Sequence, residues 1–167
     1  MSRAIYIANV LGLDMGMFYK RRDYTTIVNG RNPIVAHEFL GTSVEGKDMI
    51  IIDDMISSGE SVLEVAAALK ARKANKIFVF STFGLFTNGL DKFDKAYESG
   101  IINRVLTTNL IYQTPELLER EWYINCDLSK YIAYIIDTLN HDSSISDLLN
   151  PNERIQSIVA RYKNGEL

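Results

Sequence analysis

The sequence predicts an α/β protein with a mostly parallel sheet flanked by helices. Short apolar runs rich in β-branched residues alternate along the chain with segments whose apolar residues recur at helical spacing. No linker, internal repeat or low-complexity segment interrupts this alternation. We therefore expect residues 1–167 to form a single domain that binds ligands outside the carboxyl ends of its strands.

The strongest strand signal lies at residues 49–53, where three isoleucines precede two aspartates. Such a β-branched run favours a strand that is buried on both faces. Residues 61–72 are expected to form a helix, because apolar residues from Val62 to Leu69 recur at helical spacing. The other expected strands are residues 15–19, 76–81, 105–108 and 122–126, and the other expected helices are residues 3–11, 90–98, 130–139 and 151–162. A further short helix is expected near residues 34–39, inside a long loop.

Composition argues against nucleic-acid and membrane partners. The chain is 47% hydrophobic and 23% charged with a net charge of −3, which is normal for a domain with a good core. The compact basic cluster Lys20-Arg21-Arg22 is too small to neutralise a nucleic-acid backbone. No apolar stretch approaches the roughly 20 residues that span a bilayer, and the N-terminus lacks a signal-peptide pattern. A cytoplasmic location is expected.

Cysteine and histidine give no sign of a zinc site. The single cysteine, Cys126, cannot form an internal disulfide, and His37 and His141 lie far apart in the sequence. Buried packing is the expected role of Cys126.

The best candidate for a ligand site lies at residues 50–61, where Asp53 and Asp54 end a strand just before a helix. The turn between this strand and the helix consists of small and hydroxyl-bearing residues, which include Ser57, Ser58, Gly59 and Ser61. Such a turn offers N–H groups, hydroxyls and the positive end of a helix dipole to a phosphate. The two carboxylates could hold ribose hydroxyls or a hydrated Mg²⁺. A sugar-phosphate site is therefore predicted, and the alternative is an ordinary turn in which Ser58 or Ser61 caps the helix.

The wording IIIDDMISSGES fits neither GxxxxGK[ST] nor GxGxxG. It resembles the phosphoribosyl-pyrophosphate-binding motif of type I phosphoribosyltransferases, in which a hydrophobic strand, an acidic pair and a small hydroxyl-rich loop follow one another. The resemblance implies the type I phosphoribosyltransferase fold. It also implies ribose-phosphate binding by Asp53, Asp54 and the loop residues Ser57, Ser58, Gly59, Glu60 and Ser61.

A second motif, MGMFYKRRD at residues 15–23, predicts a strand that carries three consecutive cations into a loop. Lys and Arg side chains can stabilise the charge that develops on phosphate oxygens during diphosphoryl transfer. A KRR run after a strand resembles ribose-phosphate pyrophosphokinase, which implies that Lys20 and Arg22 are a catalytic pair on a mobile loop over the ATP phosphates. The alternative is a solvated basic loop.

The resemblance to ribose-phosphate pyrophosphokinase extends over nearly the whole chain and covers the C-terminal half of that enzyme. It includes Arg3-Ala4, EGKDMIIIDDMISSGES, VLTTNLI and residues 129–139. It implies that most adenine-binding and metal-binding residues belong to an absent N-terminal half. The metal ligands are therefore unknown from this sequence, and Asp53 and Asp54 could contact Mg²⁺ through water. A homo-oligomer, or pairing with the missing N-terminal domain, is expected, because the lost central strand would leave a sheet edge unpaired.

The phosphate loop departs from the family pattern, which commonly reads DTAGT or DTGGT after the acidic pair. Ser57 replaces the acidic first residue, and Glu60 stands where a small residue is usual. Glu60 would repel a ribose phosphate unless its side chain points outward or caps the helix. Phe83 likewise stands where many relatives have His.

Three functions remain open from the sequence. The resemblance implies diphosphoryl transfer from Mg-ATP to ribose 5-phosphate, giving phosphoribosyl pyrophosphate and AMP in nucleotide biosynthesis, with this chain as a partial enzyme. The first alternative is a phosphoribosyltransferase that uses phosphoribosyl pyrophosphate, although no base-binding hood is recognisable. The second is a non-catalytic, ribose-phosphate-binding regulatory subunit, which Ser57 and the missing half favour.

Two further segments follow strand ends at the same rim, residues 83–87 and Thr107-Thr108-Asn109. Each could line the ligand site or only end its strand. Phe78 and Phe80 are expected to pack in the core.

Overall fold

The computed structural model describes residues 2–22 and 34–166. The chain divides into two compact units, Met1–Ser43 and Val44–Leu167. Within the described residues, no helix is both long and apolar enough to cross a membrane.

The first unit holds one helix and one antiparallel pair of strands. Its elements are α1 (Ser2–Leu11), β1 (Met17–Arg22) and β2 (Ile34–Leu40). Phe18 lies opposite Phe39 across the pair, and their ring centroids are 5.1 Å apart. Cross-strand aromatic pairs of this kind stabilise antiparallel strands and fix their register.

Two predictions for the first unit are wrong. Residues 34–39 were expected to be helical but belong to β2, and the strand expected at residues 15–19 continues to Arg22. Pairing explains both differences, because β2 supplies hydrogen-bonding partners along β1 as far as Arg22. The three cations therefore lie in a strand and not in the loop after it. The remainder of the expected loop, residues 23–33, lies outside the described residues.

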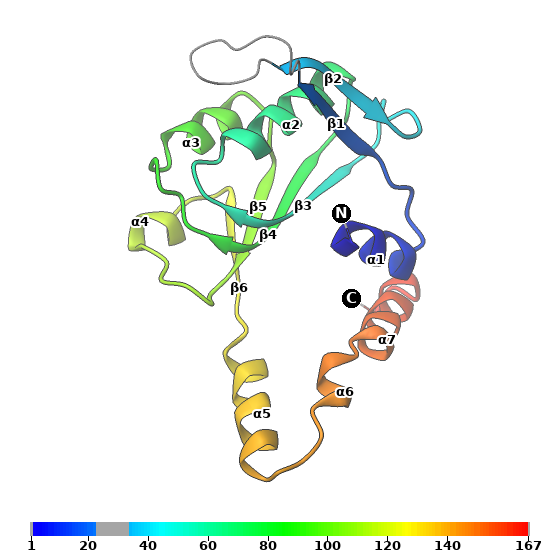
Figure 1. The fold of residues 1–167 in the computed structure, drawn as a ribbon, viewed down its shortest axis with the longest axis vertical. Coiled ribbons are helices and arrows are strands. Elements are labelled where there is room, and N and C mark those ends of the chain that lie inside the picture. Colours follow the sequence, from blue (N-terminus) through cyan, green and yellow to red (C-terminus); the bar gives the residue numbers. More distant parts are fainter. Residues whose placement is uncertain (1, 23–33, 167) are drawn as a thin grey trace. The chain divides into compact units, whose positions relative to one another are not determined.

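The second unit is built on a four-stranded sheet in the order β3-β4-β5-β6, with every neighbouring pair parallel. Its strands are β3 (Met49–Ile56), β4 (Ile77–Gly84), β5 (Arg104–Thr108) and β6 (Tyr123–Cys126). Its helices are α2 (Glu60–Ala71), α3 (Asp91–Glu98), α4 (Pro115–Leu118), α5 (Ser129–Asn140), α6 (Ser146–Leu149) and α7 (Asn152–Lys163). The predicted α/β fold with a parallel sheet is confirmed (Figure 1).

The core of the second unit lies between the sheet and the helices α2 and α3. Ile77, Val79 and Val105 of the sheet have no exposed surface. Phe93 of α3 is also fully buried and stacks on Trp122, with ring centroids 5.4 Å apart. The helices add the buried residues Val62, Ala66, Leu69 and Ala96. Aromatic stacking adds about 1 kcal/mol per pair to the stabilisation from area burial.

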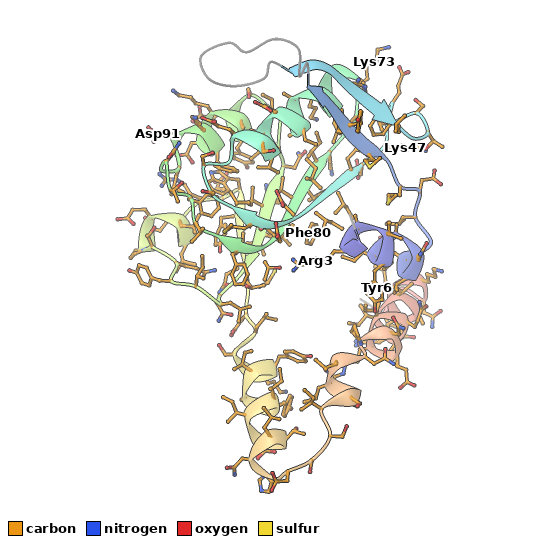
Figure 2. All side chains as sticks on the ribbon, in the orientation of Figure 1. Arg3, Tyr6, Lys47, Lys73, Phe80 and Asp91 are labelled. Atoms are coloured by element: carbon orange, nitrogen blue, oxygen red, sulfur yellow. The ribbon has the colours of Figure 1, made fainter. Side chains whose placement is uncertain are left out.

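The opposite face of the sheet is half exposed, which corrects two predictions. Ile50 of β3 is 42% exposed, although its strand was expected to be buried on both faces. Phe80 of β4 is 36% exposed and was expected in the core (Figure 2). Ile50 of β3 pairs with Phe78 of β4, and Phe80 lies two residues further along β4. Side chains two residues apart in a strand point to the same face, so Ile50 and Phe80 share one face of the sheet. Helices α2 and α3 cover the face that carries Val79.

Asp94 links α3 to the chain just before β6. Its Oδ1 accepts a hydrogen bond from Trp122 Nε1 at 2.6 Å and one from Arg120 Nε at 3.0 Å. Trp122 is only 1% exposed, so its indole N–H has little access to water. A buried donor without an acceptor is costly, so Asp94 both satisfies and orients the indole.

Gly59 allows α3 to pack closely against the turn between β3 and α2. Its φ is +78°, and a Cβ atom at this position would lie 2.3 Å from Cε2 of Phe93. Both the backbone conformation and the space therefore require glycine.

Replacing Asp94 by Ala should lower the free energy of unfolding by about 2 kcal/mol, because the Trp122 N–H loses its acceptor inside the core. The matched control is Asp91→Ala, which removes the same charge from an exposed position on the same helix and should cost about 0.5 kcal/mol. Urea unfolding followed by circular dichroism measures both variants. Equal losses would show that helix charge, and not the indole hydrogen bond, explains the effect of Asp94.

Gly59→Ala should destabilise the protein more than Gly89→Ala. Gly89 has a similar φ of +75°, but a Cβ atom added there would meet no heavy atom within 4 Å, so its substitution reports backbone strain alone, about 1–2 kcal/mol. Gly59→Ala adds the clash with Phe93, which should cost about 1–3 kcal/mol more, as is typical of core overpacking. Urea unfolding of the two variants gives the difference, and a difference near zero would contradict the close packing.

Candidate functional site

Asp53 and Asp54 lie near the carboxyl end of β3. Because β3 runs to Ile56, both residues are inside the strand, and their side chains point to opposite faces of the sheet. Asp53 is half-buried, and its Oδ1 accepts a hydrogen bond from the Asp54 backbone N–H at 2.8 Å. Asp54 is exposed. The two carboxylates thus present acceptors on both sides of the strand end and do not form one chelating pair.

The turn after β3 opens α2 without a capping side chain. Gly59 is the N-cap residue and makes no side-chain hydrogen bond to the helix. Ser58 Oγ lies 3.5 Å from the Glu60 N–H, at the limit of a hydrogen bond, and Ser57 and Ser61 are exposed. The first backbone N–H groups of a helix need partners from outside the helix. The turn can therefore offer them to a bound anion, together with the hydroxyls of the serines.

The segment between β4 and α3 is hydrogen-bonded to Ser57, the first residue of this turn. Thr87 N–H donates to the Ser57 carbonyl at 3.0 Å, and Leu85 N–H donates to the Ile56 carbonyl at 2.8 Å. The Ser57 and Thr87 hydroxyl oxygens are 3.4 Å apart. The sequence pointed to Thr87 only within a general segment, because its partner lies 30 residues away and no local pattern links them.

Glu60 is held by α3. Its Oε1 accepts a hydrogen bond from Lys92 Nζ at 2.6 Å, in an ion pair whose Lys92 and Glu60 side chains are 48% and 61% exposed. The sequence left open whether the Glu60 side chain points outward or caps the helix, and the structure gives it this partner. Sequence reasoning missed Lys92, which is 32 residues away from Glu60.

The other two candidate segments at the rim contain structural contacts. Phe86, within residues 83–87, is 8% exposed and packs edge-on against Phe93. Thr107 is buried, and its hydroxyl lies 2.7 Å from the Tyr123 hydroxyl, whose pKa is raised by burial. Asn109 Oδ1 accepts from the Leu128 N–H at 2.8 Å and so fixes the start of α5. These residues therefore complete the ends of the strands.

Lys20 and Arg22 belong to the first unit, where Lys20 lies opposite His37 and Arg22 opposite Ile34 in the strand pair. The structure describes their backbone, and their side chains fall outside the described part. Asp53, Asp54 and the serine turn belong to the second unit. The predicted catalytic pair and the predicted ribose-phosphate site thus belong to different units.

In the part of the chain that the structure describes, no three His, Cys, Asp or Glu side chains are grouped to hold a metal ion. Cys126 is half-buried at the end of β6, and burial raises the pKa of its thiol. A protonated thiol in this position suits packing better than ligation or nucleophilic chemistry.

Several known proteins with similar sequences are named ribose-phosphate pyrophosphokinase. A ribose-phosphate pyrophosphokinase of Vibrio cholerae is 30% identical over 149 residues, which cover 89% of this chain and 44% of that protein. The ribose-phosphate pyrophosphokinase of Thermococcus kodakarensis is 33% identical over 124 residues, 72% of this chain and 42% of that protein. This chain therefore spans less than half of the length of these curated relatives.

A crystal structure of phosphoribosylpyrophosphate synthetase from Mycobacterium smegmatis has a similar fold. Its TM-score is 0.64 at 19% sequence identity, and the match covers 86% of this chain and 43% of that one. The model of the phosphoribosyl synthetase-associated domain matches residues 26–150, which is most of this chain. On this match, together with the parallel sheet and the serine turn after β3, the chain belongs to the phosphoribosyl synthetase-associated domain family.

Proposed function

We propose that this chain is the ribose-phosphate-binding half of a ribose-phosphate pyrophosphokinase. The complete enzyme would transfer the diphosphoryl group of Mg-ATP to ribose 5-phosphate, giving phosphoribosyl pyrophosphate and AMP for nucleotide biosynthesis. The observation that carries this proposal is the turn of residues 57–61, which opens α2 without a capping side chain directly after Asp53 and Asp54. The names of the similar proteins favour the same reaction.

The chain would correspond to the C-terminal half of that enzyme. The order of motifs supports this placement, because the acidic pair, the serine turn and VLTTNLI resemble the C-terminal half of the family. A coverage of 44% of a relative corresponds to about half of its length, whichever half that is. A second chain, or another copy of this one, would then supply the remaining groups of the active site.

In this proposal the phosphate of ribose 5-phosphate binds the N–H groups and hydroxyls of residues 57–61. Asp53 and Asp54 accept hydrogen bonds from ribose hydroxyls, and charged acceptors make such bonds strong. Lys20 and Arg22 would neutralise the phosphates of ATP, where a point charge and a forked guanidinium complement each other. In this proposal the second unit binds ribose 5-phosphate, and Lys20 and Arg22 bind ATP.

Magnesium fits this chain only as a companion of the substrates. The described residues offer Asp53 and Asp54 but no group of three ligands. Mg²⁺ commonly keeps several waters and binds through one or two carboxylates together with substrate phosphates. When bound, it would neutralise negative charge on the phosphates, while Asp53 or Asp54 would hold it through water.

A non-catalytic regulatory subunit remains the second candidate. The observation that favours it is Ser57, which stands in place of an acidic residue and pairs with Thr87. Such a subunit would bind ribose 5-phosphate and associate with a complete enzyme without turning over Mg-ATP.

Calorimetric titration of the purified chain with ribose 5-phosphate should show saturable binding that weakens about tenfold in Asp54→Asn, as expected for one lost charge-assisted hydrogen bond. The matched control is Asp142→Asn, an exposed residue with φ +51°, a conformation that Asn tolerates. Its affinity should equal that of the wild type. Absence of wild-type binding at millimolar ligand would refute the proposed ribose-phosphate site.

The double variant Lys20→Ala, Arg22→Ala should keep its affinity for ribose 5-phosphate within about twofold and should bind Mg-ATP about tenfold more weakly. A control double variant, Arg161→Ala with Lys163→Ala, removes the same two charges from exposed positions of α7. Titrations with each ligand separate the two roles. If both double variants lose Mg-ATP affinity equally, net charge and not the Lys20–Arg22 pair explains the effect.

A further inference from the structure

We infer that Lys92 is a positioning residue of the ribose-phosphate site: it holds the Glu60 carboxylate on α3 and so leaves the start of α2 open to the substrate phosphate. This inference rests on the proposed function and assigns a role to a residue outside the acidic pair and the serine turn. Its basis is the 2.6 Å ion pair between Lys92 Nζ and Glu60 Oε1.

Glu60 is the first residue of α2 and therefore lies beside the N–H groups that a phosphate would use. A carboxylate in the first turn of a helix is attracted to the same positive dipole end as a bound anion. Without a partner, Glu60 would compete with the phosphate for this position or repel it. The family pattern usually has a small residue here, so the repulsion between Glu60 and the phosphate is specific to loops like this one.

Lys92 reduces this repulsion in two ways. It compensates the negative charge of Glu60, and it directs the carboxylate toward α3. Opposite charges in contact are an effective way to keep a carboxylate near an anion site, because the field of the pair falls off faster than that of the single charge.

Helix α3 is fixed close to the turn, so the ion pair does not depend on two mobile side chains alone. Phe93, the next residue after Lys92, fills the space beside Gly59, where a Cβ atom would lie 2.3 Å from its ring. Thr87, on the segment that leads to α3, donates its N–H to the Ser57 carbonyl at 3.0 Å. The turn is thus held by consecutive parts of the same segment, and Lys92 belongs to that segment.

The test is a double-mutant cycle on binding of ribose 5-phosphate, measured by titration calorimetry at low salt. Lys92→Ala should weaken binding about fivefold, because it leaves the negative charge of Glu60 uncompensated by Lys92 beside the phosphate. Glu60→Gln keeps the backbone N–H of residue 60 and removes only the negative charge, so it should bind more tightly than the wild type. In the Glu60→Gln background, Lys92→Ala should change the affinity by less than about twofold, and Lys92→Arg alone should keep wild-type affinity.

A second Lys–Glu pair supplies the control. Lys73 Nζ lies 2.9 Å from Glu45 Oε1 on the same unit, and Lys73→Ala removes the same charge and the same kind of contact. In Figure 2, Lys73 lies far from Asp91, the residue next to Lys92. Lys73→Ala should leave the affinity for ribose 5-phosphate unchanged. The effect of Lys92→Ala should also shrink at high salt, as expected for a partly exposed charge.

The outcomes separate the inference from the proposed function. Wild-type binding together with equal losses for Lys92→Ala in both backgrounds would mean that Lys92 contacts the phosphate directly, which overturns the positioning role. Wild-type binding with no effect of Lys92→Ala overturns it as well. If the wild type does not bind ribose 5-phosphate, the proposed function fails, and the inference fails with it. Circular dichroism of each variant shows whether a loss of affinity is only a loss of folding.

Discussion

The contact between Gly59 and Phe93 is the constraint on which the rest of the candidate site depends. It brings α3 against the turn after β3, and no side chain larger than hydrogen fits between them. The same approach places Lys92 within reach of Glu60 and Thr87 within reach of Ser57. On its other side, Phe93 stacks on Trp122, which Asp94 orients. The serine turn is therefore connected through Phe93 to the buried aromatic cluster around Trp122.

This arrangement assigns different tasks to the two sides of the turn. One side consists of backbone N–H groups and serine hydroxyls without a capping side chain, which suits an anion. The other side is fixed by packing and by the Glu60–Lys92 pair. A binding loop whose backbone is already held loses less conformational entropy when the ligand binds, so rigidity on one side favours affinity on the other.

Much of the second unit could be predicted from the sequence because its signals are local. The isoleucine run before Asp53 and the helical spacing from Val62 to Leu69 predicted β3 and α2 to within a few residues. The serine turn was found from its residue types and its position after a strand. These signals need only neighbours in the sequence, and tertiary contacts agree with them.

The features that the sequence did not predict depend on partners that are distant in the chain. Residues 34–39, expected to be a helix, form β2, and pairing with β2 extends β1 through Lys20. The exposure of Phe80 depends on which face the helices cover, which an apolar run cannot specify. Lys92 gave no signal, because an exposed lysine on a helix becomes informative only when its partner is known. The short helices α4 and α6 were too brief to show a period.

The position of Trp122 has a practical consequence for spectroscopy. It is the single tryptophan of the chain, it belongs to the second unit, and it is stacked on the ring that contacts Gly59. Its fluorescence therefore reports the state of the core of the second unit. The emission of one indole thus offers an optical signal close to the serine turn, without any label having to be attached.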